Sequence, residues 1–157
     1  MMTYVMDSSS FRVLSHYFPD RFPSFWERFN VLVGQKRIIS AREARWELDH
    51  RINKQHLLDW IHANRQIFLT PSPEETEFIS EIFLIKHFQQ LVSRQNSLNG
   101  KPVADPYIIA LARSRNGCVV TEEQHKPNAA KIPNVCEHFG ISCFNLERMM
   151  SQEGWEF

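Results

Sequence analysis

Residues 3–10, Thr-Tyr-Val-Met-Asp-Ser-Ser-Ser, join a short apolar run to a group of helix-capping residues. The apolar run covers residues 3–6 and stops at Asp7, and a stretch of helical character follows over residues 11–18. Asp and Ser accept hydrogen bonds from the free N–H groups at a helix start, so this order predicts a strand, a turn and a helix.

The same alternation of strand and helix continues along the chain. Further strands are expected at residues 37–39, 67–69, 118–120 and 141–144. Helices are expected at residues 25–33, 41–63, 78–92, 107–113, 132–140 and 145–150, the second being one helix about 35 Å long. Parallel strands need crossover connections, which helices supply. We therefore predict an α/β fold, a three-layer α/β/α sandwich with a central, mainly parallel sheet of about five strands, in a single domain over residues 1–157.

The composition excludes several classes of protein. The 157 residues are 43% hydrophobic and 23% charged, which argues against a disordered chain or a coiled coil. Lys plus Arg and Asp plus Glu each number 18, so any contact with nucleic acid must come from a local basic patch. No apolar run approaches the ~20 residues that span a bilayer, and no basic leader opens the chain. We expect a cytoplasmic protein without a membrane partner.

The cysteines and histidines do not have the spacing of a zinc site. Cys118, Cys136 and Cys143 are odd in number and lack the CxxC pattern, which predicts reduced thiols packed as small hydrophobes. Three of the histidines are spaced six residues apart within residues 50–62, which scatters them around a helix.

Acidic residues stand where a parallel sheet binds ligands, beyond the carboxyl ends of its strands. Asp7 follows the first strand, Glu123 follows the fourth, and Asp105 begins the helix that leads into the fourth. Glu43 and Glu47 lie one turn apart on the helix after the second strand. Carboxylates that converge repel one another and recruit cations, and oxygen ligands select Mg²⁺ or Mn²⁺. Two such ions can clamp the oxygens of a phosphodiester, so the acids predict hydrolysis of nucleic acid.

Each acid also has a purely structural explanation. Asp7 and Asp105 are good residues at a helix start whatever the function. Glu47 can pair with Arg51 on a solvated helix face, and Glu123 can be an ordinary turn residue. The joint arrangement, rather than any one acid, therefore supports the functional interpretation.

Four segments carry a family resemblance. They are Tyr-Val-Met-Asp-Ser-Ser at residues 4–9, Ile-Ser at 39–40 followed by Glu43 and Glu47-Leu48, Ala-Asp-Pro-Tyr-Ile-Ile-Ala-Leu-Ala at 104–112, and Val-Val-Thr-Glu-Glu at 119–123. Together they resemble the PIN-domain family, whose small members include the VapC-like toxin ribonucleases of prokaryotic toxin–antitoxin pairs. The resemblance covers nearly the whole chain, and the tail from residue 131 is similar to a PIN-like branch more than to a standard toxin.

The resemblance implies that Asp7, Asp105 and Glu123 bind one or two Mg²⁺ or Mn²⁺ ions. Glu47, followed by leucine as in the family, is the better match for a further catalytic acid, and Glu43 on the same face is the alternative or additional metal ligand. Many relatives have Asp at the position of Glu123, whose extra methylene moves its oxygens outward.

The activity that the resemblance implies is an endoribonuclease, in which a metal-activated water attacks phosphorus and leaves 5′-phosphate and 3′-hydroxyl ends. Ser9 and Thr121 are candidates to hydrogen-bond a metal-bound water or the substrate. Arg42 and Arg45, from a cluster of basic residues between positions 36 and 65, are candidates to hold RNA phosphates. Toxin members further imply a homodimer and an antitoxin that covers the acids.

Two other functions are compatible with the same residues. A catalytically weak PIN-like module would bind RNA or protein without cutting it, and the departure at Glu123 favours that alternative. A phosphatase or another phosphoryl-transfer enzyme would use the same cation site, because a fold does not fix the substrate.

Overall fold

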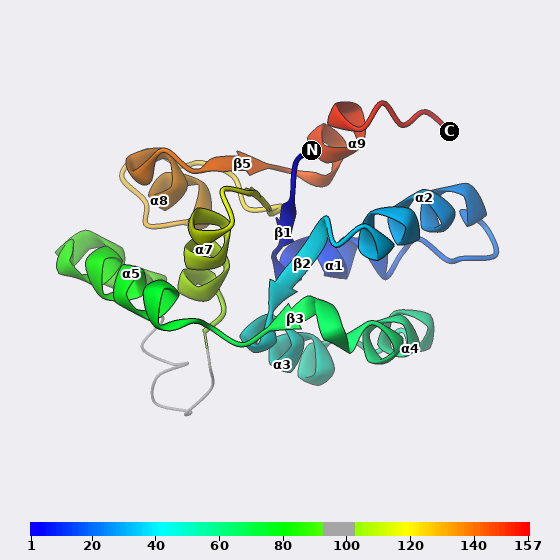
Figure 1. Ribbon diagram of the computed structural model, residues 1–157, viewed down its shortest axis with the longest axis horizontal. Coiled ribbons are helices and arrows are strands. Elements are labelled where there is room, and N and C mark those ends of the chain that lie inside the picture. Colours follow the sequence, from blue (N-terminus) through cyan, green and yellow to red (C-terminus); the bar gives the residue numbers. More distant parts are fainter. Residues whose placement is uncertain (93–102) are drawn as a thin grey trace.

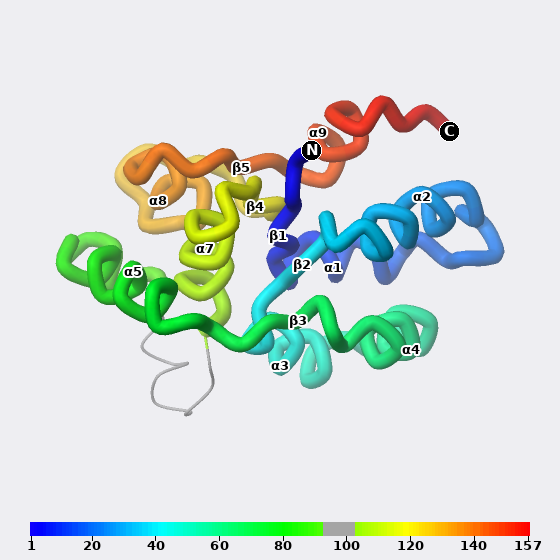
Figure 2. Tube along the Cα trace, in the orientation of Figure 1, coloured from blue at the N-terminus to red at the C-terminus, as the bar shows by residue number. Residues whose placement is uncertain are grey.

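The computed structural model describes residues 1–92 and 103–157, and a five-stranded sheet forms its centre. The strands are β1 (Tyr4–Met6), β2 (Ile38–Ala41), β3 (Phe68–Leu69), β4 (Cys118–Val120) and β5 (Ser142–Phe144). They pair in the order β3-β2-β1-β4-β5, and every pair is parallel. Figures 1 and 2 show β1 in the middle of this sheet.

Helices cover both faces of the sheet, so the predicted three-layer α/β/α fold is confirmed (Figure 1). One face packs against α5 (Pro73–Leu84), α7 (Asp105–Ser114) and α8 (Ile132–Phe139), and the other against α1 (Ser8–Leu14), α2 (Pro23–Gly34), α4 (Gln55–Ala63) and α9 (Leu146–Gln152). The helix α3 (Arg42–Arg51) follows β2, and two short 3-10 helices, η1 (Arg65–Ile67) and η2 (Lys86–Leu91), complete the described elements. None of the helices in the described ranges has the length and apolar character needed to cross a membrane.

The two hydrophobic cores follow from the alternation of side chains along the strands. In β1, Tyr4 and Met6 point into the core beneath α1 and α2, whereas Val5 points into the core beneath α7. All three side chains are fully buried, which is expected of a central parallel strand covered on both faces.

The prediction of one helix over residues 41–63 is wrong. The chain leaves the helical conformation at Ile52, which is extended, and α4 begins only at Gln55. The break allows Leu57 of α4 to pack in the same core as Leu48 of α3.

A carboxylate that follows α9 makes a partly buried contact with the starts of β1 and β2. The phenol of Tyr4 donates a hydrogen bond to Oε2 of Glu153 at 2.6 Å. The guanidinium of Arg37 donates two hydrogen bonds, of 2.9 and 2.7 Å, to the same carboxylate. The residue just after α9 is thereby tied to the starts of β1 and β2.

Gly117 allows β4 to approach β1, and this gives a test of the fold. A Cβ at this position would lie 2.8 Å from the backbone oxygen of Thr3, the same oxygen that accepts the N–H of Cys118. We expect Gly117→Ala to lower the free energy of unfolding by about 1–3 kcal/mol, because the two strands must move apart. Urea titration measures the change.

The matched control is Gly34→Ala at the end of α2, where an added Cβ meets nothing within 4 Å. It should be neutral or slightly stabilising, since alanine restricts the unfolded chain. Equal destabilisation by both substitutions would contradict the close approach at Gly117.

Candidate functional site

The strand order places a crevice at the carboxyl ends of β1 and β4. The chain moves from β1 to β2 and β3 on one side, while β4 and β5 lie on the other side. Ligands bind at such a switch point in open parallel sheets, because the connections leave the two strand ends in opposite directions. Asp7 follows β1 here, and its N–H donates to the carbonyl of Val120, the last residue of β4, at 2.9 Å.

Asp7 is buried and oriented by two hydroxyl groups. Its Oδ2 accepts hydrogen bonds from Ser9 Oγ at 2.7 Å and from Thr121 Oγ1 at 3.0 Å. The same two hydroxyl oxygens accept hydrogen bonds from the backbone N–H groups of Glu122 and Glu123. The hydroxyl hydrogens are therefore free to be donated to the Asp7 carboxylate. Asp7 occupies the N-cap position of α1, as expected, but its side chain makes no capping hydrogen bond, so helix capping does not explain the carboxylate.

Glu47 links the other two segments of the site. Its Oε2 accepts the hydroxyl of Ser8 at 2.8 Å, and its Oε1 accepts the backbone N–H of Ala104 at 3.0 Å. The side chain is buried and bonds to neighbours of Asp7 and Asp105 rather than to Arg51. The interpretation of Glu47 as one half of a solvated ion pair is therefore wrong.

The two acids after β4 have different roles. Glu122 accepts the N–H of Leu146 at 2.9 Å, which fixes the start of α9. Glu123 accepts the N–H of Ile132 at 3.0 Å through Oε2. Burial raises the pKa of Glu123, the Ile132 N–H lowers it, and the charge of Asp7 raises it further. Glu123 is thus more than a turn residue, since it shares the electrostatic environment of Asp7.

The pKa of Asp105 responds to the charges of the other three acids of the site. It is the first residue of α7 rather than its N-cap, which is Ala104. Burial raises the pKa of Asp105 to about 8, and the charges of Asp7, Glu123 and Glu47 raise it in that order. Four acids separated by up to 116 positions, from Asp7 to Glu123, therefore act on one another at the same sheet edge.

The oxygens that remain free decide how a cation could be held. Asp7 Oδ1 is buried and has no hydrogen-bond partner, which costs about 1–3 kcal/mol unless something binds it. Both oxygens of Glu47 are engaged, and so is one oxygen of Glu123. In residues 1–92 and 103–157, no three His, Cys, Asp or Glu side chains are placed to enclose an ion together. Among the described residues, the oxygen of this cluster that is both buried and without a partner is therefore Asp7 Oδ1.

Glu43, the alternative to Glu47, has a different environment. Its Oε1 accepts a hydrogen bond from Arg42 Nε at 3.0 Å, and its Oε2 is buried without a partner. The charge of Glu47 raises the pKa of both Asp105 and Glu123. Glu47 is therefore the acid that the structure brings to the other three.

The basic residues near the site differ from those singled out in the sequence. Arg42 pairs with Glu43, and Arg45 lies 3.6 Å from Asp49 in an ion pair on the same helix. Arg51 instead lies close enough to Asp105 to lower its pKa. Sequence reasoning missed this placement because Arg51 has the same helical spacing to Glu47 as an ordinary surface pair.

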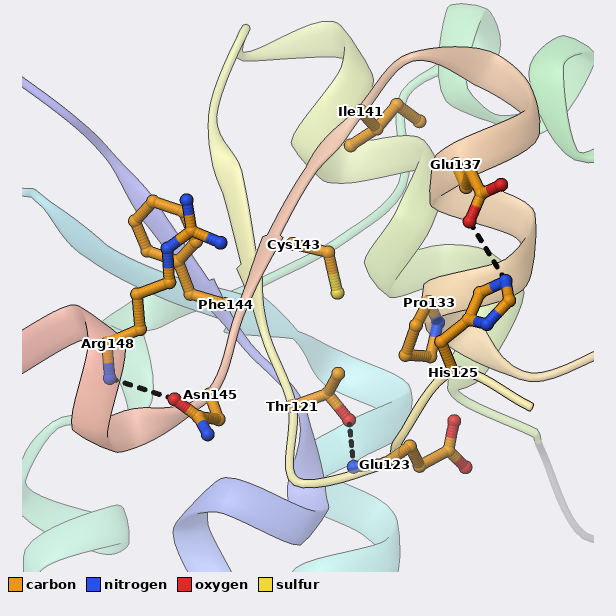
Figure 3. Close-up of a pocket in the computed structure, with 10 residues that line it drawn as sticks. All are labelled: Thr121, Glu123, His125, Pro133, Glu137, Ile141, Cys143, Phe144, Asn145 and Arg148. Carbon is orange, nitrogen blue, oxygen red and sulfur yellow. Dashed lines mark hydrogen bonds and ion pairs between the residues drawn. The ribbon is translucent and has the colours of Figure 1, made fainter.

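A hollow of about 400 Å³ adjoins the acids on the side of β5 (Figure 3). Thr121 and Glu123 form its boundary with the acid cluster, and the β4–α8 loop, α8, β5 and α9 supply the other walls. Arg148 lies over the ring of Phe144 on one wall, and His125 pairs with Glu137 on another. The sequence gives no signal for this hollow, because its polar residues come from four separate segments.

Comparisons with known proteins agree with the fold and identify a family. No curated protein matches the chain. The crystal structure of PAE2754 from Pyrobaculum aerophilum is similar, with a TM-score of 0.51 and 10% sequence identity over 96% of this chain and 88% of that one. So distant a likeness supports the fold alone. Residues 4–157 match the family described as Domain of unknown function (DUF4411), and the chain therefore belongs to the DUF4411 family.

Proposed function

We propose that this protein is a metal-dependent endoribonuclease of the PIN-like kind, with Mg²⁺ or Mn²⁺ held by Asp7 and Asp105. The buried, unpartnered Oδ1 of Asp7 carries the proposal, because it lies in a cluster with three other carboxylates at the switch point of the sheet. The family resemblance extends the proposal to the toxin of a toxin–antitoxin pair.

A bound cation supplies two things to phosphodiester hydrolysis, a lower pKa of its water and compensation of the phosphate charge. In the reaction, the water oxygen bonds to phosphorus, the bond to the 3′ oxygen breaks, and that oxygen leaves as a hydroxyl after taking a proton. The hydrogen bonds from Ser9 and Thr121 to Oδ2 hold the Asp7 carboxylate in one orientation and leave Oδ1 as its free oxygen.

Electrostatics explains why a cation belongs in this mechanism. The acid cluster repels an RNA phosphate, and burial together with the charges of the other three acids raises the pKa of Asp105 to about 8. A divalent ion offsets both effects of these charges. Arg51, a positive group that lowers the pKa of Asp105, is a candidate to contact the approaching phosphate.

A second candidate is a PIN-like module that binds RNA or protein with little cleavage. The hydrogen bonds that engage both oxygens of Glu47 and one oxygen of Glu123 favour it, because they reduce the number of free ligands.

The test is cleavage of a panel of tRNA, rRNA fragments and single-stranded DNA with Mg²⁺, with Mn²⁺ and with EDTA. We expect wild type to cut RNA only with the metals, and Asp7→Asn to lower the rate at least about 100-fold. Asp20→Asn, an exposed aspartate between α1 and α2, is the matched control and should cut normally. Circular dichroism and thermal unfolding confirm that the variants fold.

Cleavage that persists in EDTA or in folded Asp7→Asn would contradict the proposal. Wild type that binds RNA and cuts nothing would support the binding module instead. The toxin role has its own readout, since expression of wild type should arrest growth whereas expression of Asp7→Asn should not.

A further inference from the structure

The hollow beside β5 is placed to receive the part of a substrate next to the acids. It has a volume of about 400 Å³, which is ample for one nucleobase with its sugar. Thr121 and Glu123 belong both to its wall and to the acid cluster. A chain whose phosphate lies at Asp7 and Asp105 would therefore direct an adjoining nucleotide into this hollow.

One wall offers a flat cationic surface. The guanidinium carbon of Arg148 lies 4.3 Å from the centre of the Phe144 ring, so the two planar groups pack together. The Oδ1 of Asn145 accepts the backbone N–H of Arg148 at 2.8 Å and fixes the start of its helix. Among the described residues, no ion pair involves the Arg148 side chain. Unstacked RNA bases commonly lie on aromatic rings and arginine planes of this kind.

Another wall offers a carboxylate. Glu137 lies on α8, and its Oε2 is 2.9 Å from His125 Nε2 in an ion pair. Figure 3 shows the two side chains next to each other. The Glu137 side chain is 73% exposed, so it can bind a ligand without any rearrangement of the core. A carboxylate accepts several hydrogen bonds and donates none.

We propose that this hollow binds the base of the nucleotide that adjoins the scissile phosphodiester, with guanine preferred. The inference rests on the proposed nuclease function. Guanine presents two parallel donors, its N1–H and its exocyclic amino group, which match the two oxygens of Glu137. The Oε2 that pairs with His125 keeps a lone pair for a second hydrogen bond. Adenine and cytosine present one amino donor beside an acceptor, and uracil presents one N–H between two acceptors. Arg148 stacks on any base, whereas Glu137 discriminates between them.

The experiment is a titration of ¹⁵N-labelled protein with GMP, AMP, CMP and UMP in the presence of EDTA. We expect GMP to shift the amide resonances of Thr121, Cys143 and Asn145 and to bind about tenfold more tightly than the other three nucleotides. Glu137→Gln should lower GMP affinity to the level of AMP, because an amide offers one acceptor and one donor. Arg148→Gln should weaken all four nucleotides alike.

Glu147→Gln, an exposed glutamate on α9 that does not line the hollow, is the matched control and should change nothing. Equal affinity for the four nucleotides, or unchanged GMP affinity in Glu137→Gln, would overturn the inference. The titration contains no metal and measures no cleavage. RNA cleavage without GMP binding would therefore overturn the base pocket alone. GMP binding without cleavage would overturn the nuclease, and the hollow would then be a guanine-binding site unconnected with a scissile bond.

Discussion

Asp105→Asn is expected to abolish RNA cleavage, by about 10³-fold, and at the same time to raise the unfolding temperature. The loss follows because asparagine is a weaker ligand than a carboxylate for a hard cation. The gain follows because burial and the charges of Asp7, Glu123 and Glu47 all oppose ionisation of Asp105. A tenfold change in proton affinity corresponds to about 1.4 kcal/mol. We therefore expect the unfolding temperature to rise by at least about 3 °C at pH 8 with EDTA.

The pH dependence of this gain has a definite sign. The folded protein holds the proton on Asp105 up to a pKa of about 8, whereas the unfolded chain releases it near the ordinary value of 3.8. Between these values the unfolded state binds fewer protons, so rising pH favours unfolding of wild type. Asp105→Asn lacks this effect. Its advantage should vanish near pH 4 and reach its maximum at pH 8, as measured by thermal unfolding across that range.

Magnesium distinguishes this explanation from a general stabilisation. On the proposed function, wild type should gain thermal stability with increasing Mg²⁺, because an ion held by Asp7 and Asp105 would bind only the folded state, and Asp105→Asn should gain much less. Asp20→Asn is again the matched control and should behave as wild type in both titrations. An Asp105→Asn variant that is less stable than wild type at pH 8 would contradict the electrostatic account of the site.

Glu153→Ala is expected to cost about 3 kcal/mol of unfolding free energy, the largest stability loss that we predict. The side chains of Arg37 and Glu153 are only 12% and 13% exposed, and removal of the carboxylate leaves a nearly buried guanidinium without its partner. It also removes the acceptor of the Tyr4 phenol, whose side chain is fully buried. A loss of this size lowers the unfolding temperature by roughly 6–12 °C.

Acid provides a second measurement on the same contact. Burial alone would raise the pKa of Glu153, but the hydrogen bonds from Arg37 and Tyr4 outweigh it and leave the pKa lowered. The contribution of Glu153 is therefore present above the ordinary glutamate pKa and is lost as the pH falls through the folded value. The difference between wild type and Glu153→Ala should shrink below about pH 4.5.

Glu156→Ala, three residues further along, is exposed and serves as the matched control. It should unfold at the temperature of wild type. The contact lies at the opposite end of β1 from Asp7, so Glu153→Ala should cut RNA normally below its unfolding temperature. A loss of activity per folded molecule would contradict that separation.

The fold could be predicted from the sequence wherever burial and turn residues act together. Strands were predicted at residues 3–6 and 118–120, close to the observed β1 and β4, because each is a short apolar run closed by polar residues. The break after α3 was not predicted, because residues 41–63 contain neither glycine nor proline to mark it. Tertiary packing of Leu57 overrides the local preference there.

The acidic residues of the candidate site could be predicted from the sequence, but the hydrogen bonds that hold them could not. Asp7, Glu47, Asp105 and Glu123 follow from their positions relative to the strands, and the structure brings their charges together. The hydroxyl of Ser8 on Glu47 and the hydroxyls on Asp7 could not be predicted, since serine near a helix start is usually a cap. Their roles depend on the reversal of strand order between β1 and β4, which exists only once the sheet has assembled.

The central place of β1 has a consequence for the folding pathway. Its two neighbours in the sheet lie at residues 38–41 and 118–120, so β1 acquires both partners only after segments far apart in the sequence have met. Such non-local parallel pairing is slow, because the loop-closure entropy is lost before the contacts form. We therefore expect the carboxylates beyond β1 and β4 to come together at a late stage of folding.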